Sequence, residues 1–445
     1  MRISADFNQP VGVMKPMHGV GQPPMVQLND FMMHYLTEAG IPYSRLHDVQ
    51  GPQGANAYVD IPNIFRNFEA DVEDPASYDF AFTDAFLSKM IAHHVEPFFR
   101  LGVTIENCFY LKPLRIDPPK DFTKWARICE HIIRHYNHGW ADGFHFGIKY
   151  WEIWNEPDDG CYDVKLSGMW KGTPEQFFDF YATAARHLKA CFGDEIQVGG
   201  YGACGFWEYR KDLEANGLGR APQTQREGYL EFAHRFLQFV HDEKVPLDFF
   251  SWHSYADLKD TVEMARYCRR LLKKHGLADV PDFLNEWNTC FEAKRRGSDY
   301  AAAQVFGMML AMQKEETKML NYYDARLGFS GYGGMFNPDT WEPYLAYFVF
   351  KMFHDAYQLK NEMQSASDDP DVYVCAAGND RRRVLLLANV SDRKMDAELD
   401  LQGVSVSEAE VVMTNSVYRN SLTGIRIASD GKLSIPPYTC VELRF

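Results

Sequence analysis

The sequence predicts an α/β protein: a (β/α)8 TIM barrel followed by a smaller antiparallel β-sandwich. Between residues 14 and 355, short apolar segments alternate eight times with longer segments whose apolar residues recur every three to four positions. After residue 355 the helical pattern stops, and short β-rich runs separated by Gly, Asp, Asn and Pro follow. A doubly wound open sheet is the alternative for the first part, and the count of eight favours a closed barrel.

The expected strands are short and apolar, and several end in polar residues. They cover residues 14–21, 41–48, 95–103, 148–156, 195–202, 247–255, 282–287 and 318–324. Amphipathic helices are expected between and after them, over residues 26–38, 82–94, 122–137, 174–190, 226–242, 260–275, 299–314 and 342–355. Each strand is therefore followed by a helix, the order that builds a parallel barrel.

The β-rich part begins near the polar, turn-rich segment 364–371. The runs after it, from VYVCAA to YTCVELRF, are typical of a small antiparallel β-sandwich. We expect the barrel to span residues 14–355 and the sandwich to span residues 356–445. The run RISADF, within residues 1–13, is expected to add a strand to the sandwich.

Composition excludes several classes of function. Acidic residues outnumber basic ones by 61 to 46, a balance that argues against binding a nucleic-acid backbone. No run of about 18 apolar residues occurs, so we expect no membrane span. The nine cysteines contain no Cys-x-x-Cys pair, so we expect free thiols and no metal site. The start lacks an apolar signal-peptide core, which favours a cytoplasmic location, with a removed leader as the alternative.

The fourth expected strand reads IKYWEIWNE and is followed by Pro157. Proline cannot donate to a sheet ladder, so the strand must stop near it. The carboxyl ends of barrel strands converge on one mouth, and Glu156 is expected there. Glu152 lies deeper along the strand and is expected to be a structural ion partner.

A second carboxylate, Glu286, ends the seventh expected strand in the run LNEWN. Strands four and seven lie nearly opposite each other in an eight-stranded barrel, so Glu156 and Glu286 could face each other across the mouth. Carboxyl groups about 5–5.5 Å apart are typical of retaining glycosidases, and a gap of about 6.5–9.5 Å is typical of inverting ones.

Polar residues on two other strands point to the same mouth. Period two places His253 and Tyr255 on one face of the sixth strand, and Arg45 and His47 on one face of the second. On an inward face, Tyr255 could donate to a carboxylate and His253 could reach a sugar hydroxyl. A buried arginine needs an anionic partner, and Glu286 is a candidate for Arg45.

The motifs WEIWNEP, SWHSY and FLNEWN, in this order, resemble those of clan A glycoside hydrolases. With the upstream Arg45-x-His47 and the C-terminal β-rich region, the chain is similar to family 39, known for β-xylosidases and α-L-iduronidases. The resemblance implies that Glu156 is the acid/base and Glu286 the nucleophile. It also implies that Asn155 contacts the sugar 2-hydroxyl.

Two positions depart from the family's xylosidase-like pattern. Arg100 stands on the third strand where an acidic residue is expected, and we interpret it as a salt-bridge partner, with recognition of an acidic sugar as the alternative. The eighth strand carries Tyr322 and Tyr323 and lacks the clan's usual tryptophan. Both departures bear on which sugar is bound.

The resemblance implies a retaining, exo-acting, β-xylosidase-like hydrolase of oligosaccharides derived from plant or other polysaccharides, without cofactor or metal. The alternatives are an arabinoside, glucoside or uronide as substrate, or a carbohydrate-binding barrel without activity. Tryptophans near strand ends are candidate sugar platforms, of which we expect one or two to serve: Trp154, Trp170, Trp207, Trp287 and Trp341.

A dinucleotide-dependent enzyme is a further alternative. Gly200-x-Gly202-x-x-Gly205 formally matches the phosphate-binding fingerprint. It occurs in the fifth strand–helix unit, however, and the sequence after it does not resemble the start of a helix. We therefore interpret it as a glycine-rich loop over the barrel mouth.

Overall fold

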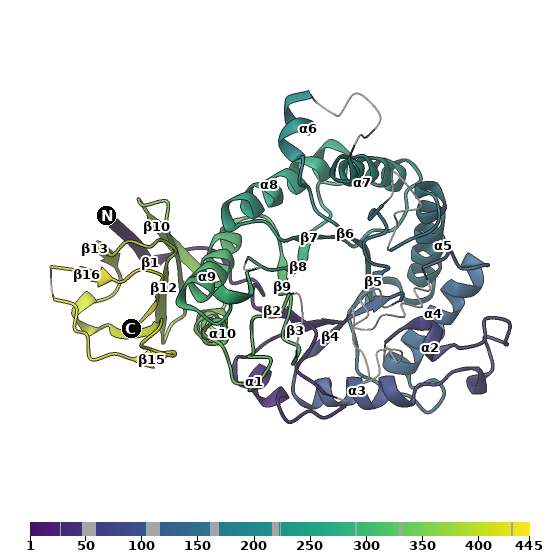
Figure 1. Ribbon diagram of the computed structural model, residues 1–445, viewed down its shortest axis with the longest axis horizontal. Helices are drawn as coiled ribbons and strands as arrows, with labels where there is room; N and C mark the ends of the chain where they lie inside the picture. The colour runs from purple at the N-terminus through teal and green to yellow at the C-terminus, as the bar shows by residue number, and fades with distance from the viewer. Residues whose placement is uncertain are drawn as a thin grey trace.

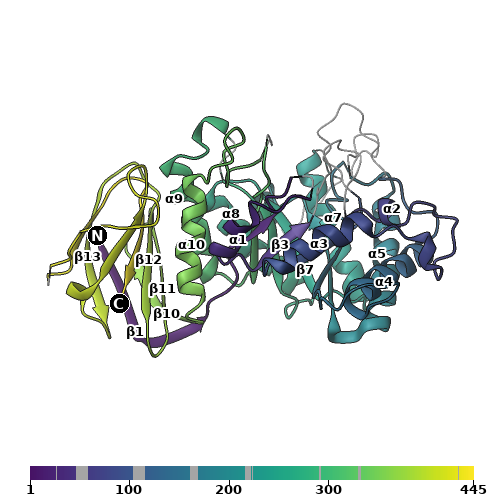
Figure 2. The same cartoon turned by 90° about the horizontal axis from the view of Figure 1, so that it is seen from below.

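The computed structural model contains a closed barrel of eight parallel strands with a nine-stranded sheet beside it (Figures 1 and 2). The predicted fold class is therefore confirmed. The structure describes residues 1–26, 28–46, 59–103, 116–160, 169–215, 222, 224–289, 292–328, 332–428 and 430–445.

The barrel strands all overlap the ranges expected from the sequence. They are β2 (Gly19–Gly21), β3 (Tyr43–Leu46), β4 (Glu96–Leu101), β5 (Tyr150–Ile153), β6 (Gln197–Ala203), β7 (Phe249–Ser254), β8 (Asp282–Trp287) and β9 (Met319–Tyr322). Strand β9 pairs in parallel with β2 and closes the barrel. Strand β5 ends at Ile153, earlier than its expected end at residue 156, because the backbone turns at Trp154 with a φ of 69°.

Helices surround the barrel (Figure 1). Those that overlap the expected helices are α1 (Met33–Glu38), α3 (Ala81–Ala92), α4 (Phe122–His138), α5 (Pro174–Phe192), α7 (Gln225–Asp242), α8 (Leu258–Lys274), α9 (Asp299–Lys314) and α10 (Leu345–Tyr357). Short helices that the sequence analysis did not expect are α2 (Ile61–Ile64) and α6 (Tyr209–Ala215). Local sequence explains several helix starts. Thr173 and Gln176 form a capping box at α5, for example.

The barrel interior is built in layers, because alternate residues of each strand point inward. The lowest layer is aromatic: Phe98, Phe249 and Phe283 pack together with Tyr43 and Tyr150 around them. Two residues further along the same strands, the interior becomes polar. This second layer contains Arg45, Arg100, Glu152, Ser251 and Asn285, all buried. The aromatic layer thus closes the barrel beneath a charged layer that supports the mouth.

The nine-stranded sheet is mostly antiparallel. Its strands are β1 (Arg2–Val13), β10 (Asn361–Ser367), β11 (Val372–Gly378), β12 (Arg383–Asn389), β13 (Met395–Gln402), β14 (Glu410–Thr414), β15 (Ser421–Leu422), β16 (Lys432–Ile435) and β17 (Cys440–Arg444). Strand β1 lies between β10 and β13, and pairs with β13 in parallel.

The two faces of this sheet bury different side chains. On β12, Val384 and Leu386 join the core that contains helices α9 and α10, whereas Leu385 and Leu387 face a second core within the curled sheet. This alternation is the period-two pattern of a strand covered on both faces. The sheet therefore packs directly on the last two barrel helices (Figure 2).

Within the described ranges, no helix combines the length and the apolar character needed to cross a membrane.

Candidate active site

Glu286 is directed into the barrel by an irregularity in β8. Along the β7–β8 pair, Trp252 is opposite Leu284 and His253 is opposite Glu286, so Asn285 is one extra residue on β8. A bulge of this kind changes which way the following side chain points. As a result Asn285 and Glu286 both reach the interior network, although they are consecutive in the chain.

Glu156 lies just beyond β5, in a backbone conformation that non-glycine residues rarely adopt. Its φ is 45°, and that of Trp154 is 69°. The Glu156 N–H donates to the carbonyls of Tyr201 and Gly202, each at 3.1 Å, which holds the loop against β6. Strained conformations of this kind persist where the surroundings enforce them, and they cluster at functional sites.

His253 lies near the carboxyl end of β7, and its ring is close to both carboxylates. The Nδ1 atom of His253 lies 2.6 Å from Oε1 of Glu156 and 3.7 Å from Oε2 of Glu286. One oxygen of Glu156 and one of Glu286 are within 4.8 Å of each other. Glu156 is the more accessible of the pair, with 15% of its side chain exposed against 6% for Glu286.

Arg45 connects the charged layer to the mouth. Its guanidinium donates to Oε2 of Glu152 at 2.8 Å and to Oε2 of Glu286 at 2.9 Å. A third donor of the same group reaches Oδ1 of Asn155 at 2.6 Å. Burial opposes the charged guanidinium, but the two carboxylates raise the pKa of Arg45, so it stays cationic.

Glu152 is fully buried and is also held by Ser251 and Asn285, which donate to its Oε1 at 2.6 and 2.7 Å. Burial opposes ionisation, but the charge of Arg45 and the hydrogen bond from Ser251 outweigh it and lower the pKa of Glu152. Glu152 is thus an ionised structural partner and not a mouth residue.

Tyr255 donates its hydroxyl hydrogen to Oε1 of Glu286, on the opposite side from Arg45. Burial, and then the charge of Glu286, raise the pKa of Tyr255, so the phenol keeps the proton that it donates. The Tyr255 ring packs against Tyr332 and Tyr323, with ring centroids 4.9 and 6.5 Å away. Tyr323 therefore supports Tyr255 from the end of β9, the eighth barrel strand, where the tryptophan usual in the clan is missing.

The glycines of the apparent dinucleotide fingerprint have a different explanation. Gly200 and Gly202 lie within β6 and not in a loop leading into a helix. A Cβ at Gly202 would come within 3.1 Å of Oδ1 of Asn155 and of Nε2 of His253. Gly202 also has a φ of 67°, so glycine is required there by conformation and by the closeness of the site.

The other residues singled out in the sequence do not all reach the mouth. His47 lies outside the described residues. Trp287 is fully buried in the hydrophobic core, with its ring 5.2 Å from that of Tyr322. The expectation that Trp287 binds substrate stays a prediction, and the burial of its ring does not favour it. Arg100 is also fully buried, and its guanidinium lies 3.3 Å from Asp60.

The remaining tryptophans differ in exposure. Trp154 and Trp170 are buried and packed edge to face against each other. Trp207 is partly buried beneath the guanidinium of Arg226, and Trp341 is 37% exposed. Only Trp207 and Trp341 among the five thus remain candidate sugar platforms.

Sequence reasoning did not single out Asp158, which is buried beside the Glu156 loop. Its carboxylate accepts from the N–H of Cys204 at 3.0 Å. Burial, and then the charge of Glu156, raise the pKa of Asp158 well above its usual range. Two acids follow Pro157 in the sequence, and nothing in the sequence marks which of the two is buried.

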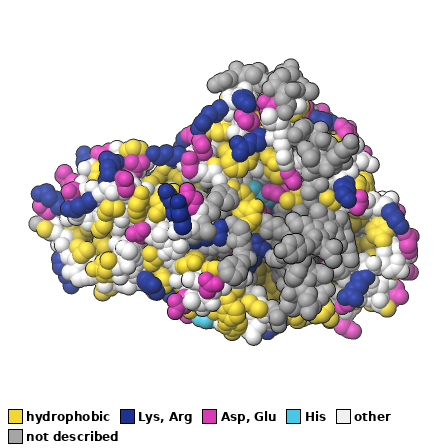
Figure 3. All heavy atoms as spheres, viewed as in Figure 1, with side chains coloured by type: hydrophobic (Ala, Val, Ile, Leu, Met, Phe, Trp, Pro, Cys, Tyr) yellow, Lys and Arg dark blue, Asp and Glu magenta, His cyan; other side chains and the backbone are white. Residues whose placement is uncertain are grey.

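Glu156, His253 and Glu286 are close enough to hold a metal ion. The oxygens of Glu286 are, however, already engaged by a cationic and a hydroxyl donor from Arg45 and Tyr255. Those partners already compensate the negative charge of Glu286 without a metal ion. In the space-filling view, acidic and hydrophobic side chains lie together near the centre of the barrel (Figure 3).

Comparisons with known proteins agree with this geometry. Residues 34–317 match the model of glycosyl hydrolases family 39. A beta-xylosidase from Geobacillus stearothermophilus is 24% identical over 270 residues, a stretch covering 54% of this chain and 46% of that enzyme. The match thus spans about half of the curated relative's length.

Solved structures resemble the whole chain. A glucosidase from Croceicoccus marinus aligns with a TM-score of 0.77 at 20% identity, covering 100% of this chain and 98% of that one. A monomeric beta-xylosidase from Caulobacter crescentus aligns with a TM-score of 0.69 at 17% identity, covering 100% and 99%. At these identities the likeness shows a shared fold.

Proposed function

The chain belongs to glycosyl hydrolases family 39, and from that premise we propose that it is a retaining glycoside hydrolase. In this proposal Glu286 is the nucleophile and Glu156 the acid/base. One observation carries the proposal: an oxygen of each carboxylate lies within 4.8 Å of the other, inside one mouth. So close an approach of the two oxygens leaves little room for a water between them, which supports the narrow pair of a retaining enzyme over the wider pair of an inverting one.

The different surroundings of the two carboxylates support the division of roles. Glu286 accepts from Arg45 and Tyr255, so its two oxygens are fixed and its negative charge is compensated. Glu156 lies 2.6 Å from Nδ1 of His253 and is the more exposed carboxylate of the pair. The acid/base must exchange protons with a leaving group and later with water, and exposure permits this.

The proposed reaction follows two steps. Glu286 attacks the anomeric carbon while Glu156 donates its proton to the glycosidic oxygen, which leaves as an alcohol. A covalent glycosyl ester on Glu286 results. Glu156, now ionised, removes a proton from a water molecule that attacks the same carbon, and the sugar is released with its original anomeric configuration.

Asn155 is placed to orient the sugar. Its Oδ1 is occupied by Arg45, which fixes the amide so that Nδ2 points elsewhere. Among the residues that the structure describes, this buried Nδ2 has no hydrogen-bond partner. A buried donor without a partner is costly, and a sugar hydroxyl at the mouth would satisfy it. This supports a contact between Asn155 and the hydroxyl next to the anomeric carbon.

For the substrate, we propose exo-cleavage of β-xylosides in oligosaccharides derived from plant or other polysaccharides. The support is the beta-xylosidase among the curated relatives and among the solved structures. A second sugar, glucose, is favoured by the structural likeness to a glucosidase. Recognition of an acidic sugar by Arg100 has less support, since its guanidinium lies against Asp60 below the mouth.

The experiment is a panel of aryl β-xyloside, β-glucoside, α-L-arabinoside and β-glucuronide substrates, with the first product followed by NMR. We expect the β-xyloside to be cleaved fastest and the β-anomer of xylose to appear first. Initial formation of the α-anomer would overturn the retaining mechanism, while faster cleavage of another glycoside would overturn only the choice of sugar. Measurable sugar binding without turnover on any glycoside would instead support a non-catalytic barrel.

We also propose that the protein works in a reducing, cytoplasmic environment. The cysteines in the described part of the chain are all free, and Cys129, Cys268, Cys375 and Cys440 among them are buried. Thiols in this state suit a reducing compartment. Fractionation of the source cells, with thiol labelling of the purified protein, tests this location.

A further inference from the structure

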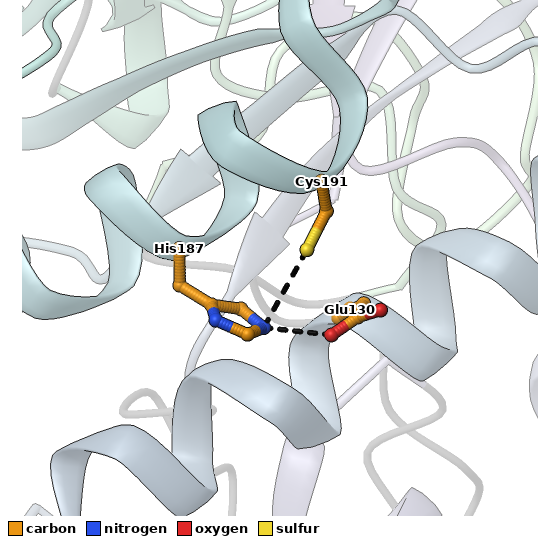
Figure 4. A group of neighbouring side chains, drawn as sticks. All are labelled: Glu130, His187 and Cys191. Carbon is orange, nitrogen blue, oxygen red and sulfur yellow. Dashed lines mark hydrogen bonds and ion pairs between the residues drawn. The ribbon is translucent and has the colours of Figure 1, made fainter.

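Three side chains with metal-binding groups meet on the outer helical layer, away from the barrel mouth. His187 and Cys191 are four residues apart on α5, so they lie on the same face of that helix. Glu130 reaches them from the neighbouring helix α4. Figure 4 shows the three groups pointing toward one another between the two helices.

The distances between the donor atoms are close to those of a coordination shell. The Nε2 atom of His187 lies 2.7 Å from Oε2 of Glu130 and 3.7 Å from Sγ of Cys191, and all three atoms are within 4.8 Å of one another. Zn²⁺ bonds of about 2.0–2.1 Å to nitrogen, about 2.0–2.2 Å to oxygen and about 2.3 Å to sulfur place tetrahedral neighbours roughly 3.3–3.6 Å apart. To admit the ion, His187 and Glu130 would have to move apart by roughly 0.7 Å, while the His187–Cys191 distance already fits.

The surroundings suit a cation that also binds water. The side chains of Glu130 and His187 are 14% and 26% exposed, so an ion can enter and a water can complete the shell. Arg134 donates to Oε1 of Glu130 at 2.7 Å, which leaves Oε2 as the ligand atom and fixes the carboxylate. The thiolate and the carboxylate together carry two negative charges, which balance those of a divalent cation, and the site retains the single positive charge of Arg134.

We propose that Glu130, His187 and Cys191 form a site for a zinc-class divalent cation that joins α4 to α5. The spacing of the cysteines predicted no metal site, because the chain contains no Cys-x-x-Cys pair. Here two ligands use helical spacing and the third comes from another helix. Binding requires the ring proton of His187 to be on Nδ1, so that Nε2 and Oε2 of Glu130 both face the ion, and it releases the proton of the Cys191 thiol to solvent.

The thiol proton makes the affinity pH-dependent. A cysteine thiol has an ordinary pKa of about 8.5, so it is mostly protonated at neutral pH in the absence of a metal. Since the metal takes only the thiolate, binding should strengthen as pH rises. The site is remote from the proposed chemistry, so the metal would stabilise the helical layer and leave glycoside cleavage unaffected.

The test uses the full chain after removal of metals by a chelator, titrated with Co²⁺ and then with Zn²⁺. We expect a near-ultraviolet thiolate-to-cobalt charge-transfer band that Zn²⁺ displaces, and a rise in Tm with Zn²⁺. Cys191→Ser should remove the band and the rise in Tm. Cys268→Ser, the same change at a buried thiol of α8, should retain both.

The cluster of Glu156, His253 and Glu286 at the barrel mouth cannot give a thiolate-to-cobalt band, because it contains no sulfur. His187→Gln gives an independent readout, and Zn²⁺ affinity should fall by at least about tenfold, the smallest loss expected even for an indirect partner of a metal. A folded wild-type chain without a thiolate band would overturn the proposal. A band that survives Cys191→Ser would overturn it equally, since the ion would then lie at another cysteine.

Discussion

Arg45 and Glu152 form an ion pair in the barrel interior, with an N–O distance of 2.8 Å and side chains no more than 1% exposed. The same guanidinium also pairs with Glu286 at the mouth. Glu152 therefore positions Arg45, and Arg45 in turn positions the proposed nucleophile. The pair therefore links the stability of the barrel to the geometry of the reaction.

Glu152→Gln should destabilise the protein. The change leaves a buried guanidinium with one fewer anionic partner, and breaking a buried pair in this way costs about 3–5 kcal/mol. Chemical denaturation at pH 7 measures the loss. Glu243→Gln, the same change at an exposed position beyond α7, should stay within about 0.5 kcal/mol of wild type. Equal stability of the two variants would contradict the role given to Glu152.

Glu286→Gln should abolish turnover on every glycoside, because no covalent intermediate can form. Glu156→Gln should depend on the leaving group: natural glycosides should lose about 10²–10⁴-fold in kcat/KM, and activated aryl glycosides much less, because their leaving groups need no proton. Full activity of Glu156→Gln on natural oligosaccharides would show that another residue is the acid/base.

Tyr255→Phe should slow catalysis without unfolding the protein. The variant loses one hydrogen bond to a charged group, worth about 1.5–3 kcal/mol, so kcat should fall by roughly 10- to 150-fold. The phenyl ring keeps the packing against Tyr332 and Tyr323. Steady-state kinetics on an aryl glycoside measure the effect, and an unchanged kcat would mean that Arg45 alone is sufficient to hold Glu286.

Asp158→Asn should change how stability depends on pH. The folded state raises the pKa of Asp158, so above the ordinary value near 4 the folded protein binds a proton that the unfolded chain releases. This contribution to stability therefore falls as pH rises, by about 1.4 kcal/mol per pH unit, until Asp158 ionises in the folded state. Asparagine does not ionise, so it removes this pH dependence of stability, and its amide oxygen can still accept from the N–H of Cys204.

We accordingly expect Asp158→Asn to match wild type near pH 4 and to be the more stable of the two at pH 6, as measured by urea unfolding at both values. A wild-type advantage that grows with pH would indicate that Asp158 is ionised in the folded protein and carries out a different task.

Local pattern was sufficient to predict most of the barrel. Apolar runs such as PFFRL on β4 locate strands, and the capping residues Thr173 and Ser298 mark where helices start. Helices α2 and α6 were not predicted because they are short, and so few residues give no periodic signal. The early end of β5 depends on the positive φ of Trp154, which tertiary contacts impose.

The site was predictable as a set of residues but not as a network. Period two indicated that Arg45, His253 and Tyr255 share a mouth with the two carboxylates. The bulge at Asn285 was not visible, and without it Trp287 seemed to accompany Glu286 into the mouth. That Arg45 would be shared between Glu152 and Glu286 depends on distances between three strands, which no local pattern encodes.

The position of β1 has a consequence for synthesis on the ribosome. Ile3 pairs with Ser367 on one side and with Leu399 on the other, so β1 is made long before either partner strand exists. Until then both of its edges present free backbone donors and acceptors, the condition that favours pairing with other chains. The order of translation thus leaves both edges of β1 without their native partner strands during most of synthesis.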